Sequence, residues 1–135
     1  MKIYVASHDV VIARKVAKKL EQAGHVITSR WLQQKYKPIE KWDEKNKQRI
    51  AAEDYNDVMD SDVLILISGN KKYPGGKFVE AGIALGVGIR IIVLGHRENM
   101  LLWHPSILVF KNINEIVQYL EDFIPGRIQC IGEGK

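Results

Sequence analysis

The run Val-Leu-Ile-Leu-Ile at residues 63–67 restricts the possible folds of this chain more than any other segment. Asp62 precedes the run and Ser68 follows it, so five apolar residues stand together without the alternation of a half-exposed strand. Continuous apolar strands of this kind are buried on both faces and occur in parallel sheets that are covered by helices. The run therefore predicts an α/β fold.

Strand-like and helix-like patterns alternate along the chain. The runs typical of strands cover residues 2–7, 25–31, 63–67, 89–94 and 107–110. Apolar residues recur at helical spacing over residues 10–22, 47–60, 77–87 and 112–123. Such alternation favours a parallel sheet with helices on both faces, and five strands indicate the flavodoxin-like (Rossmann-like) order 2-1-3-4-5. Ligands of such sheets bind beyond the carboxyl ends of the strands.

The length of 135 residues fits one domain; we expect residues 1–124 to form it and residues 125–135 to be a weakly specified tail. Cys130 is the only cysteine, which excludes an internal disulfide and favours a reducing, cytoplasmic setting. The uncharged run at 81–89 is far shorter than the ~20 apolar residues of a membrane-spanning helix, so no membrane association is expected. The four histidines are scattered, and we expect no metal site.

The net charge of +4 is concentrated in one segment. Residues 30–49 hold seven bases against three acids, and the polar stretch at 32–45 is expected to be a loop or lid. Such a segment is either a solvated face or a contact for a phosphorylated small molecule or nucleic acid. Nucleic acid is the least favoured of these, because no helix-turn-helix, RNP or zinc pattern accompanies the charge.

Glu80 is the only ionisable side chain in residues 78–89, which otherwise follow an apolar helical pattern. A helix that is apolar on nearly every side is typically buried. Gly75 and Gly76 precede the pattern and place Glu80 in its first turn, where free amides and the helix dipole favour an anion. A carboxylate there is a candidate nucleophile. The alternative is that Glu80 only caps its helix, although Lys77 stands where a capping box has Ser or Thr.

Asp54 is the second carboxylate in an unusual position. Between Ile50 and Val58 it falls within the apolar stripe of its helix, whereas Asp57 lies at the edge and Asp60 faces water. A charge is rarely buried without a partner or a purpose, although a small error in the helix boundary would turn Asp54 outwards. Two carboxylates meet the minimum requirement for cleaving a glycosidic bond. Spacing alone does not show that they converge.

The chain resembles the nucleoside 2-deoxyribosyltransferase-like family over about residues 2–120. The resemblance rests on VITSRW (26–31), DYNDVMDSDVLILIS (54–68), GGKFVEAGIALGVGIRIIVLGHREN (75–99) and the WHP that follows at 103–105. It implies a flavodoxin-like sheet, a homo-oligomer of two or more subunits, and no metal or organic cofactor. It also implies transfer of 2-deoxyribose between bases through a covalent sugar–enzyme ester, or hydrolysis of the N-glycosidic bond of nucleotides.

The resemblance also assigns residues. Glu80, in the G-x-x-x-E motif of residues 76–80, matches the nucleophile, and Asp54 matches the upstream aspartate that touches the sugar and the reacting centre. Tyr4 matches the first-strand tyrosine whose hydroxyl positions the nucleophile. Asn99 resembles a residue that reaches the ligand, in its own or a neighbouring subunit's site; the alternative is an ordinary turn residue.

Two departures leave the reaction open. Pro74 stands where transferases often carry an aspartate for the base and where nucleotide hydrolases carry a serine. Ser7-His8 replaces the Gly-Ser phosphate loop of the hydrolases. A phosphate would instead be held by the amides of Gly75 and Gly76, with Lys71, Lys72 or Lys77 nearby. The run PGG-x-x-x-E (74–80) also resembles the lysine-decarboxylase-like phosphoribohydrolases over this short stretch.

The sequence therefore predicts an enzyme that cleaves the N-glycosidic bond of a 2-deoxynucleoside and passes the sugar to another base or to water. The first alternative is a 2-deoxynucleoside 5′-monophosphate N-glycosidase, and the second is a non-catalytic nucleotide-binding module. The substrate-binding candidates are Ser7, Gly75, Gly76, Lys77, Asn99 and Trp31. Trp31, like Tyr73 and Trp103, either stacks on the base or only packs.

Overall fold

Five parallel strands form one sheet in the order β2-β1-β3-β4-β5, which confirms the predicted fold. The structure, a computed structural model, describes residues 1–34, 41–69 and 75–123. The strands are β1 (Lys2–Ala6), β2 (Val26–Ile27), β3 (Val63–Ile67), β4 (Arg90–Leu94) and β5 (Leu108–Phe110). β3 lies in the middle and every one of its residues is buried, as its continuous apolar sequence predicts.

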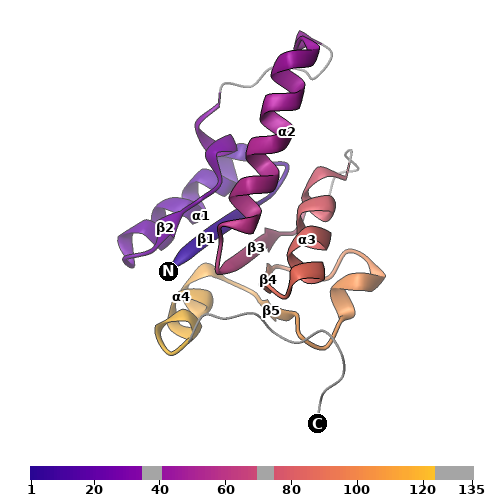
Figure 1. The fold of residues 1–135 in the computed structure, drawn as a ribbon. Coiled ribbons are helices and arrows are strands. Elements are labelled where there is room, and N and C mark those ends of the chain that lie inside the picture. The colour runs from indigo at the N-terminus through magenta and orange to yellow at the C-terminus, as the bar shows by residue number, and fades with distance from the viewer. Residues whose placement is uncertain (35–40, 70–74, 124–135) are drawn as a thin grey trace.

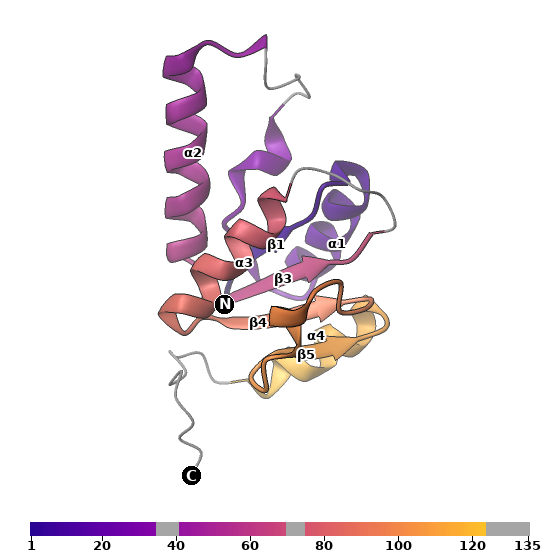
Figure 2. The same cartoon turned by 90° about the vertical axis from the view of Figure 1, so that its right-hand side faces the viewer.

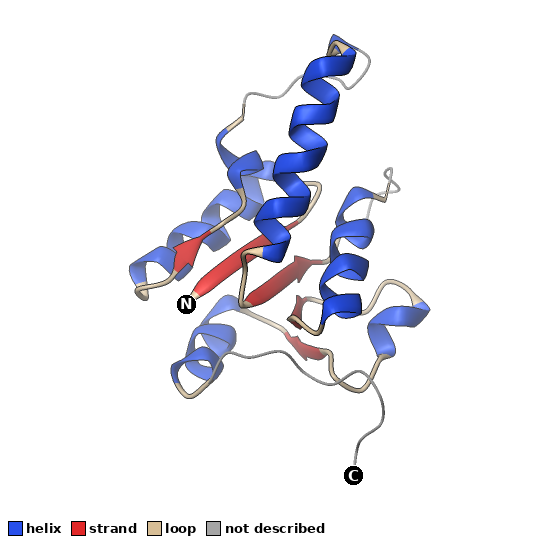
Figure 3. Cartoon of the chain, in the orientation of Figure 1, coloured by secondary structure: helices blue, strands red, loops and turns tan. Residues whose placement is uncertain are grey.

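Helices cover both faces of the sheet (Figures 1 and 3). The helices α1 (Val10–Gln22) and α4 (Ile113–Glu121) pack on one face, and α2 (Glu44–Met59) and α3 (Gly76–Val87) pack on the other. Two short 3-10 helices follow β2 and β4, η1 (Arg30–Gln33) and η3 (Met100–Trp103), and the sequence pattern does not predict them. The core therefore consists of two apolar layers, one on each side of the sheet.

The alternation of side chains along β1 decides which layer each residue joins. Ile3 and Val5 belong to the layer under α1 and α4, whereas Tyr4 and Ala6 belong to the layer under α2 and α3. All four side chains are fully buried. The phenol ring of Tyr4 thus lies on the same face of the sheet as the two helices that carry Asp54 and Glu80.

β2 is much shorter than the predicted strand over residues 25–31. Its pairing with β1 covers only Val26 and Ile27. Further along β1, the backbone N–H of Val5 donates to the buried Ser29 Oγ at 3.1 Å. This side-chain bond replaces the next rung of the ladder and releases the backbone to turn into η1.

Capping residues fix the ends of the helices. Asp9 caps α1, and its side chain accepts hydrogen bonds from two backbone amides. α2 begins three residues before the predicted start, because Asp43 accepts a hydrogen bond from the Asn46 N–H. Asn112 and Glu115 form a capping box at the start of α4.

α3 is less buried than its composition suggests. Ala81 and Ala84 face the core, but Val79 is 65% exposed and Val87 is 38% exposed. The prediction of a helix buried on nearly every side is therefore wrong, because α3 covers the sheet with one face only and leaves an apolar face outside.

The amino-terminal end of α2 projects past the rest of the molecule, as Figure 2 shows. Four exposed basic side chains lie on this end of α2 or just before it: Lys41, Lys45, Lys47 and Arg49. Residues 35–40 of the predicted loop or lid, Lys35 and Lys37 among them, lie outside the described residues, as do Cys130 and the tail from residue 125. In the described parts of the chain, no helix is long and apolar enough to cross a lipid bilayer.

Candidate functional site

The Tyr4 hydroxyl donates a hydrogen bond to Glu80 Oε2 at 2.5 Å. Tyr4 comes from β1 and Glu80 from α3, so the contact joins residues 76 positions apart in the chain. It lies beside the boundary between β1 and β3, where the strand order reverses direction in this type of sheet. Such switch points are where open α/β sheets bind their ligands.

The position of Glu80 differs from the prediction by one residue. Because α3 already begins at Gly76, Glu80 is its fifth residue and lies just past the first turn. The carboxylate is therefore held by the Tyr4 hydroxyl, and not by the free amides at the start of its own helix.

Burial raises the pKa of Glu80 from 4.5 to about 7. The hydrogen bond from Tyr4 opposes this rise because it stabilises the carboxylate form, whereas the negative charge of Asp54 adds to it. The pKa of the buried Tyr4 hydroxyl is raised well above its usual value, first by burial and then by the charge of Glu80, so Tyr4 stays a hydrogen-bond donor at neutral pH. The perturbation of a carboxylate toward neutral pH is typical of an active site.

Asp54 lies on the side of α2 that faces this pair. Its Oδ1 is buried and has no hydrogen-bond partner among the described residues, while its charge raises the pKa of both Tyr4 and Glu80. Burial, followed by the neighbouring Asp57 and Glu53, raises the pKa of Asp54 itself to about 6, and Arg30 opposes that rise. A buried acceptor without a partner costs free energy, so this oxygen is placed where a ligand could donate to it.

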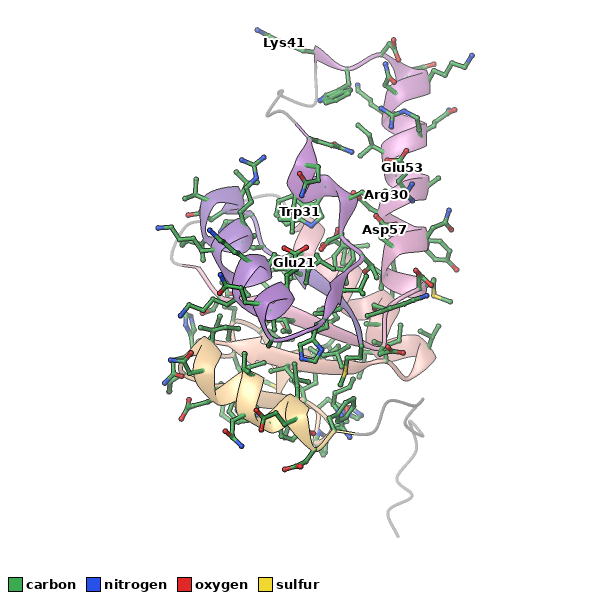
Figure 4. The ribbon with its side chains drawn as sticks, turned by 90° about the vertical axis from the view of Figure 1, so that its left-hand side faces the viewer. Glu21, Arg30, Trp31, Lys41, Glu53 and Asp57 are labelled. Carbon is green, nitrogen blue, oxygen red and sulfur yellow. The ribbon has the colours of Figure 1, made fainter. Side chains whose placement is uncertain are left out.

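Asp57 is the residue that the sequence pattern places wrongly. The pattern predicts it at the edge of the apolar stripe, yet it is buried and accepts hydrogen bonds from the backbone N–H of Arg30 at 3.0 Å and from Arg30 Nε at 2.9 Å. Figure 4 shows Arg30 of η1 and Asp57 of α2 side by side where the two elements meet. Arg30 therefore meets a carboxylate of its own chain, which ties η1 to α2 next to Asp54.

Trp31 and Ser7 lie near the carboxyl end of β1. The Trp31 indole N–H donates to the carbonyl of Val5 at 2.9 Å, and its half-buried ring packs against both core layers. The half-buried Ser7 hydroxyl accepts from the N–H of Asp9 at 3.0 Å. Both side chains are thus held by their own chain at the predicted edge of the sheet.

The residues around the start of α3 divide into two groups. Gly75 and Gly76 are exposed, and no side chain caps the helix there. Lys77, by contrast, is buried: its Nζ donates to the Ile67 carbonyl at 3.0 Å and to Glu98 Oε1 at 2.7 Å. Lys71, Lys72, Tyr73 and Pro74 lie outside the described residues.

Asn99 lies apart from the carboxylate pair. Its side chain accepts from the N–H of Leu102 and caps η3. It lines an apolar groove of about 320 Å³ between α3 and η3, whose other members are Phe78, Ala81, Gly82, Leu85, Ile91, Met100, Leu101, Leu102 and Ile107. Asn99 therefore borders a different surface of the chain from Tyr4, Asp54 and Glu80.

The described residues contain no group of three or more His, Cys, Asp or Glu side chains that could hold a metal ion. The site instead brings together two carboxylates and a phenol, each shifted in pKa by burial and by the others. In chemical terms, a set of this kind can supply a nucleophile, a proton carrier and a positioning hydroxyl.

No protein-family model matches this chain, and no curated protein matches it by sequence. Solved structures do share its fold. A 2-deoxyribosyltransferase from Bacillus psychrosaccharolyticus aligns with a TM-score of 0.70 and 21% identity, over 88% of this chain and 92% of its own. A CMP N-glycosidase from Clostridium botulinum aligns with a TM-score of 0.58 and 18% identity, over 91% of this chain and all of its own.

A conserved protein from Enterococcus faecalis V583 aligns with a TM-score of 0.66 and 14% identity, over 90% of this chain and 97% of its own. At these levels of identity the three likenesses show a shared flavodoxin-like fold over nearly the whole length of each chain. The two enzymes among them have the fold on which the Tyr4, Asp54 and Glu80 site is built here.

Proposed function

We propose that this chain is a nucleoside 2-deoxyribosyltransferase-like enzyme, which cleaves the N-glycosidic bond of 2-deoxynucleosides and transfers the deoxyribosyl group to another base or to water. The observation that carries the proposal is the hydrogen bond from Tyr4 to Glu80, made within the field of a second half-buried carboxylate, Asp54. The fold shared with a 2-deoxyribosyltransferase and a CMP N-glycosidase supports it.

In the first step Glu80 attacks the anomeric carbon C1′ with Oε1, the oxygen that does not accept the Tyr4 hydrogen bond. The new C1′–O bond forms as the C1′–N bond breaks, and the electron pair of that bond leaves with the base. Tyr4 holds the carboxylate in line and keeps it ionised, because its hydrogen bond stabilises the charged form.

Asp54 supplies the proton that the departing base needs. Its pKa of about 6 leaves part of the population protonated near neutral pH, which suits a group that gives and takes protons. The Oδ1 atom, buried without a partner among the described residues, orients the sugar by accepting a hydroxyl donor.

In the second step water or a second base attacks C1′ on the face that the first base left. The C1′–O bond to Glu80 breaks, the carboxylate is restored, and the proton of the attacking group passes to Asp54. Two inversions at C1′ give retention of configuration. Side chains of the protein supply every group in this sequence, so the proposed reaction uses no metal or organic cofactor.

Hydrolysis of nucleoside 5′-monophosphates is the second candidate, and the likeness to a CMP N-glycosidase favours it. It would use the same Glu80 ester with water as the acceptor. The binding module without turnover predicts affinity for nucleotides but no release of base.

A chromatographic assay separates these possibilities. Purified protein is incubated with each of the four deoxynucleosides and their 5′-monophosphates, with and without a free acceptor base, beside Glu80→Ala. We expect new nucleosides when an acceptor is present, and no product from Glu80→Ala. Free base from monophosphates alone would establish the hydrolase, whereas a Glu80→Ala variant as active as the parent would refute the assignment of the nucleophile.

We also propose that the chain forms a homo-oligomer through the apolar face of α3 and η3. Met100 is 81% exposed and Leu101 is 68% exposed, and both line the groove beside α3. Trp103, the last residue of η3, is 65% exposed. Contiguous apolar surface of this kind typically marks a protein interface. Asn99 stands at its rim, where a neighbouring subunit would meet it.

A further inference from the structure

The start of α1 lies at the switch point of the sheet. The loop of residues 7–9 joins β1 to α1, and it contacts the end of β3: a Cβ added to Gly69 would lie only 2.8 Å from His8 Nε2. β3 leads toward α3 and Glu80, so the amino-terminal end of α1 belongs to the same edge of the sheet as the candidate site. In sheets of this type, free amides at such a helix start bind the phosphate of a nucleotide.

A carboxylate already occupies these amides. Asp9 Oδ1 accepts from the N–H of Val11 at 3.0 Å and from the N–H of Ile12 at 3.1 Å. The N–H of Asp9 itself donates to Ser7 Oγ at 3.0 Å. The N–H groups of Asp9, Val11 and Ile12, which could have bound a phosphate, are thus used by side chains of the loop, and one of those side chains is itself an anion.

Three described cations, Arg14, Arg30 and Lys77, also have internal partners. Arg14, the first basic residue of α1, donates from Nε to the Leu32 carbonyl at 2.7 Å. Arg30 is paired with Asp57. Lys77 is buried and paired with Glu98 at 2.7 Å. A phosphate is normally held by charge-assisted hydrogen bonds, and each of these three cations donates to a partner within the chain instead.

We propose that Asp9 makes the site selective for nucleosides over nucleoside 5′-monophosphates, by occupying the amides at the start of α1 and repelling a phosphate there. The inference rests on the proposed function, and it chooses between the two substrate classes that the function leaves open. At about 4 Å in water, each pair of like unit charges weakens binding about fivefold, so one carboxylate is enough to discriminate.

The test compares substrate selectivity in two matched variants. Asp9→Asn removes the charge and keeps a side chain that caps helices equally well, and Asp9→Ser does the same with a smaller cap. Asp43→Asn is the control, because Asp43 caps the projecting end of α2 in the same manner and is exposed. For each protein, kcat/KM for base release and the Kd from calorimetry are measured with the four deoxynucleosides and their 5′-monophosphates.

We expect the parent to prefer nucleosides, and both Asp9 variants to lose about fivefold or more of that preference in kcat/KM and in Kd. Asp43→Asn should keep the parent ratio. A parent that prefers monophosphates, or Asp9 variants with an unchanged ratio, would overturn the role of Asp9 while leaving the proposed reaction intact. A protein that neither binds nor cleaves any of the eight compounds would overturn the proposed function, and this inference with it.

Discussion

At the scale of single residues, the site depends on opposing effects on one carboxyl group. Burial and the charge of Asp54 favour the neutral form of Glu80, and the Tyr4 hydroxyl favours the carboxylate that the proposed reaction needs. The resulting pKa of about 7 keeps a large fraction of Glu80 ionised at neutral pH. Tyr4 is therefore the residue whose removal should change the ionisation of Glu80 most directly.

Tyr4→Phe should raise the pKa of Glu80 above that of the parent, because it removes the hydrogen bond that stabilises the carboxylate. Carbon-detected NMR titration of the Glu80 side-chain carboxyl measures this without a substrate. Tyr119→Phe, on α4 at the opposite face, is the control. An unchanged or lower pKa in Tyr4→Phe would contradict the account of the contact.

Glu80→Gln should stabilise the protein near neutral pH. Between pH 4.5 and about 7 the folded state retains the Glu80 proton that the unfolded chain has lost, so stability falls as pH rises through this window. The variant lacks this loss and should be more stable than the parent at pH 8, by on the order of 1–3 kcal/mol.

Urea unfolding at pH 5 and pH 8 measures the difference. The difference in free energy of unfolding between variant and parent should be larger at pH 8 than at pH 5. Both proteins should still lose some stability as the pH rises, because both keep Asp54, whose pKa is also raised. A gap of equal size at the two pH values would show that the carboxyl of Glu80 is not raised in pKa.

At the scale of elements, local signals predict most of the fold, and tertiary contacts account for what they miss. The N-cap Asp9 and the apolar run of β3 are visible in the sequence because their effects are local. The early end of β2 is not, because it depends on a hydroxyl–amide bond between Ser29 and Val5. The burial of Asp57 could not be predicted from the sequence pattern either, because it follows from the packing of η1 and Arg30 against α2.

Ser29→Ala should destabilise the fold by about 1–3 kcal/mol, because it leaves the N–H of Val5 without its partner in a buried position. Ser106→Ala, in a half-buried loop, should cost less. Both are measured by urea unfolding at one pH. A Ser29→Ala variant as stable as the parent would show that the β1 ladder does not depend on this side chain.

At the scale of the whole molecule, the topology predicts the edge of the sheet where a ligand binds, but not which side chains meet there. Asp54 and Glu80 are far apart in sequence, and their interaction depends on how α2 and α3 pack over the same face of the sheet. The family resemblance supplied the pairing of Tyr4 with Glu80, which spacing alone does not. The exposed apolar face of α3 was missed because an apolar helix gives the same pattern whether neighbouring elements or another subunit cover it.

Leu101→Glu should shift the chain toward monomers in analytical ultracentrifugation, since it places a charge in the proposed interface. Val26→Glu, on an exposed edge strand, is the matched control and should leave the assembly unchanged. A parent that sediments as a monomer, or equal effects of the two substitutions, would contradict the proposed interface.

The most direct test of the proposed chemistry is to find the sugar on Glu80. The protein is mixed with a 2-deoxynucleoside that it cleaves, quenched in acid during turnover, digested, and analysed by peptide mass spectrometry. We predict one deoxyribosyl group on the peptide that contains Glu80, and none on the same peptide from Glu80→Gln. Turnover without an adduct, or an adduct on another residue, would show that the reaction does not proceed through a Glu80 ester.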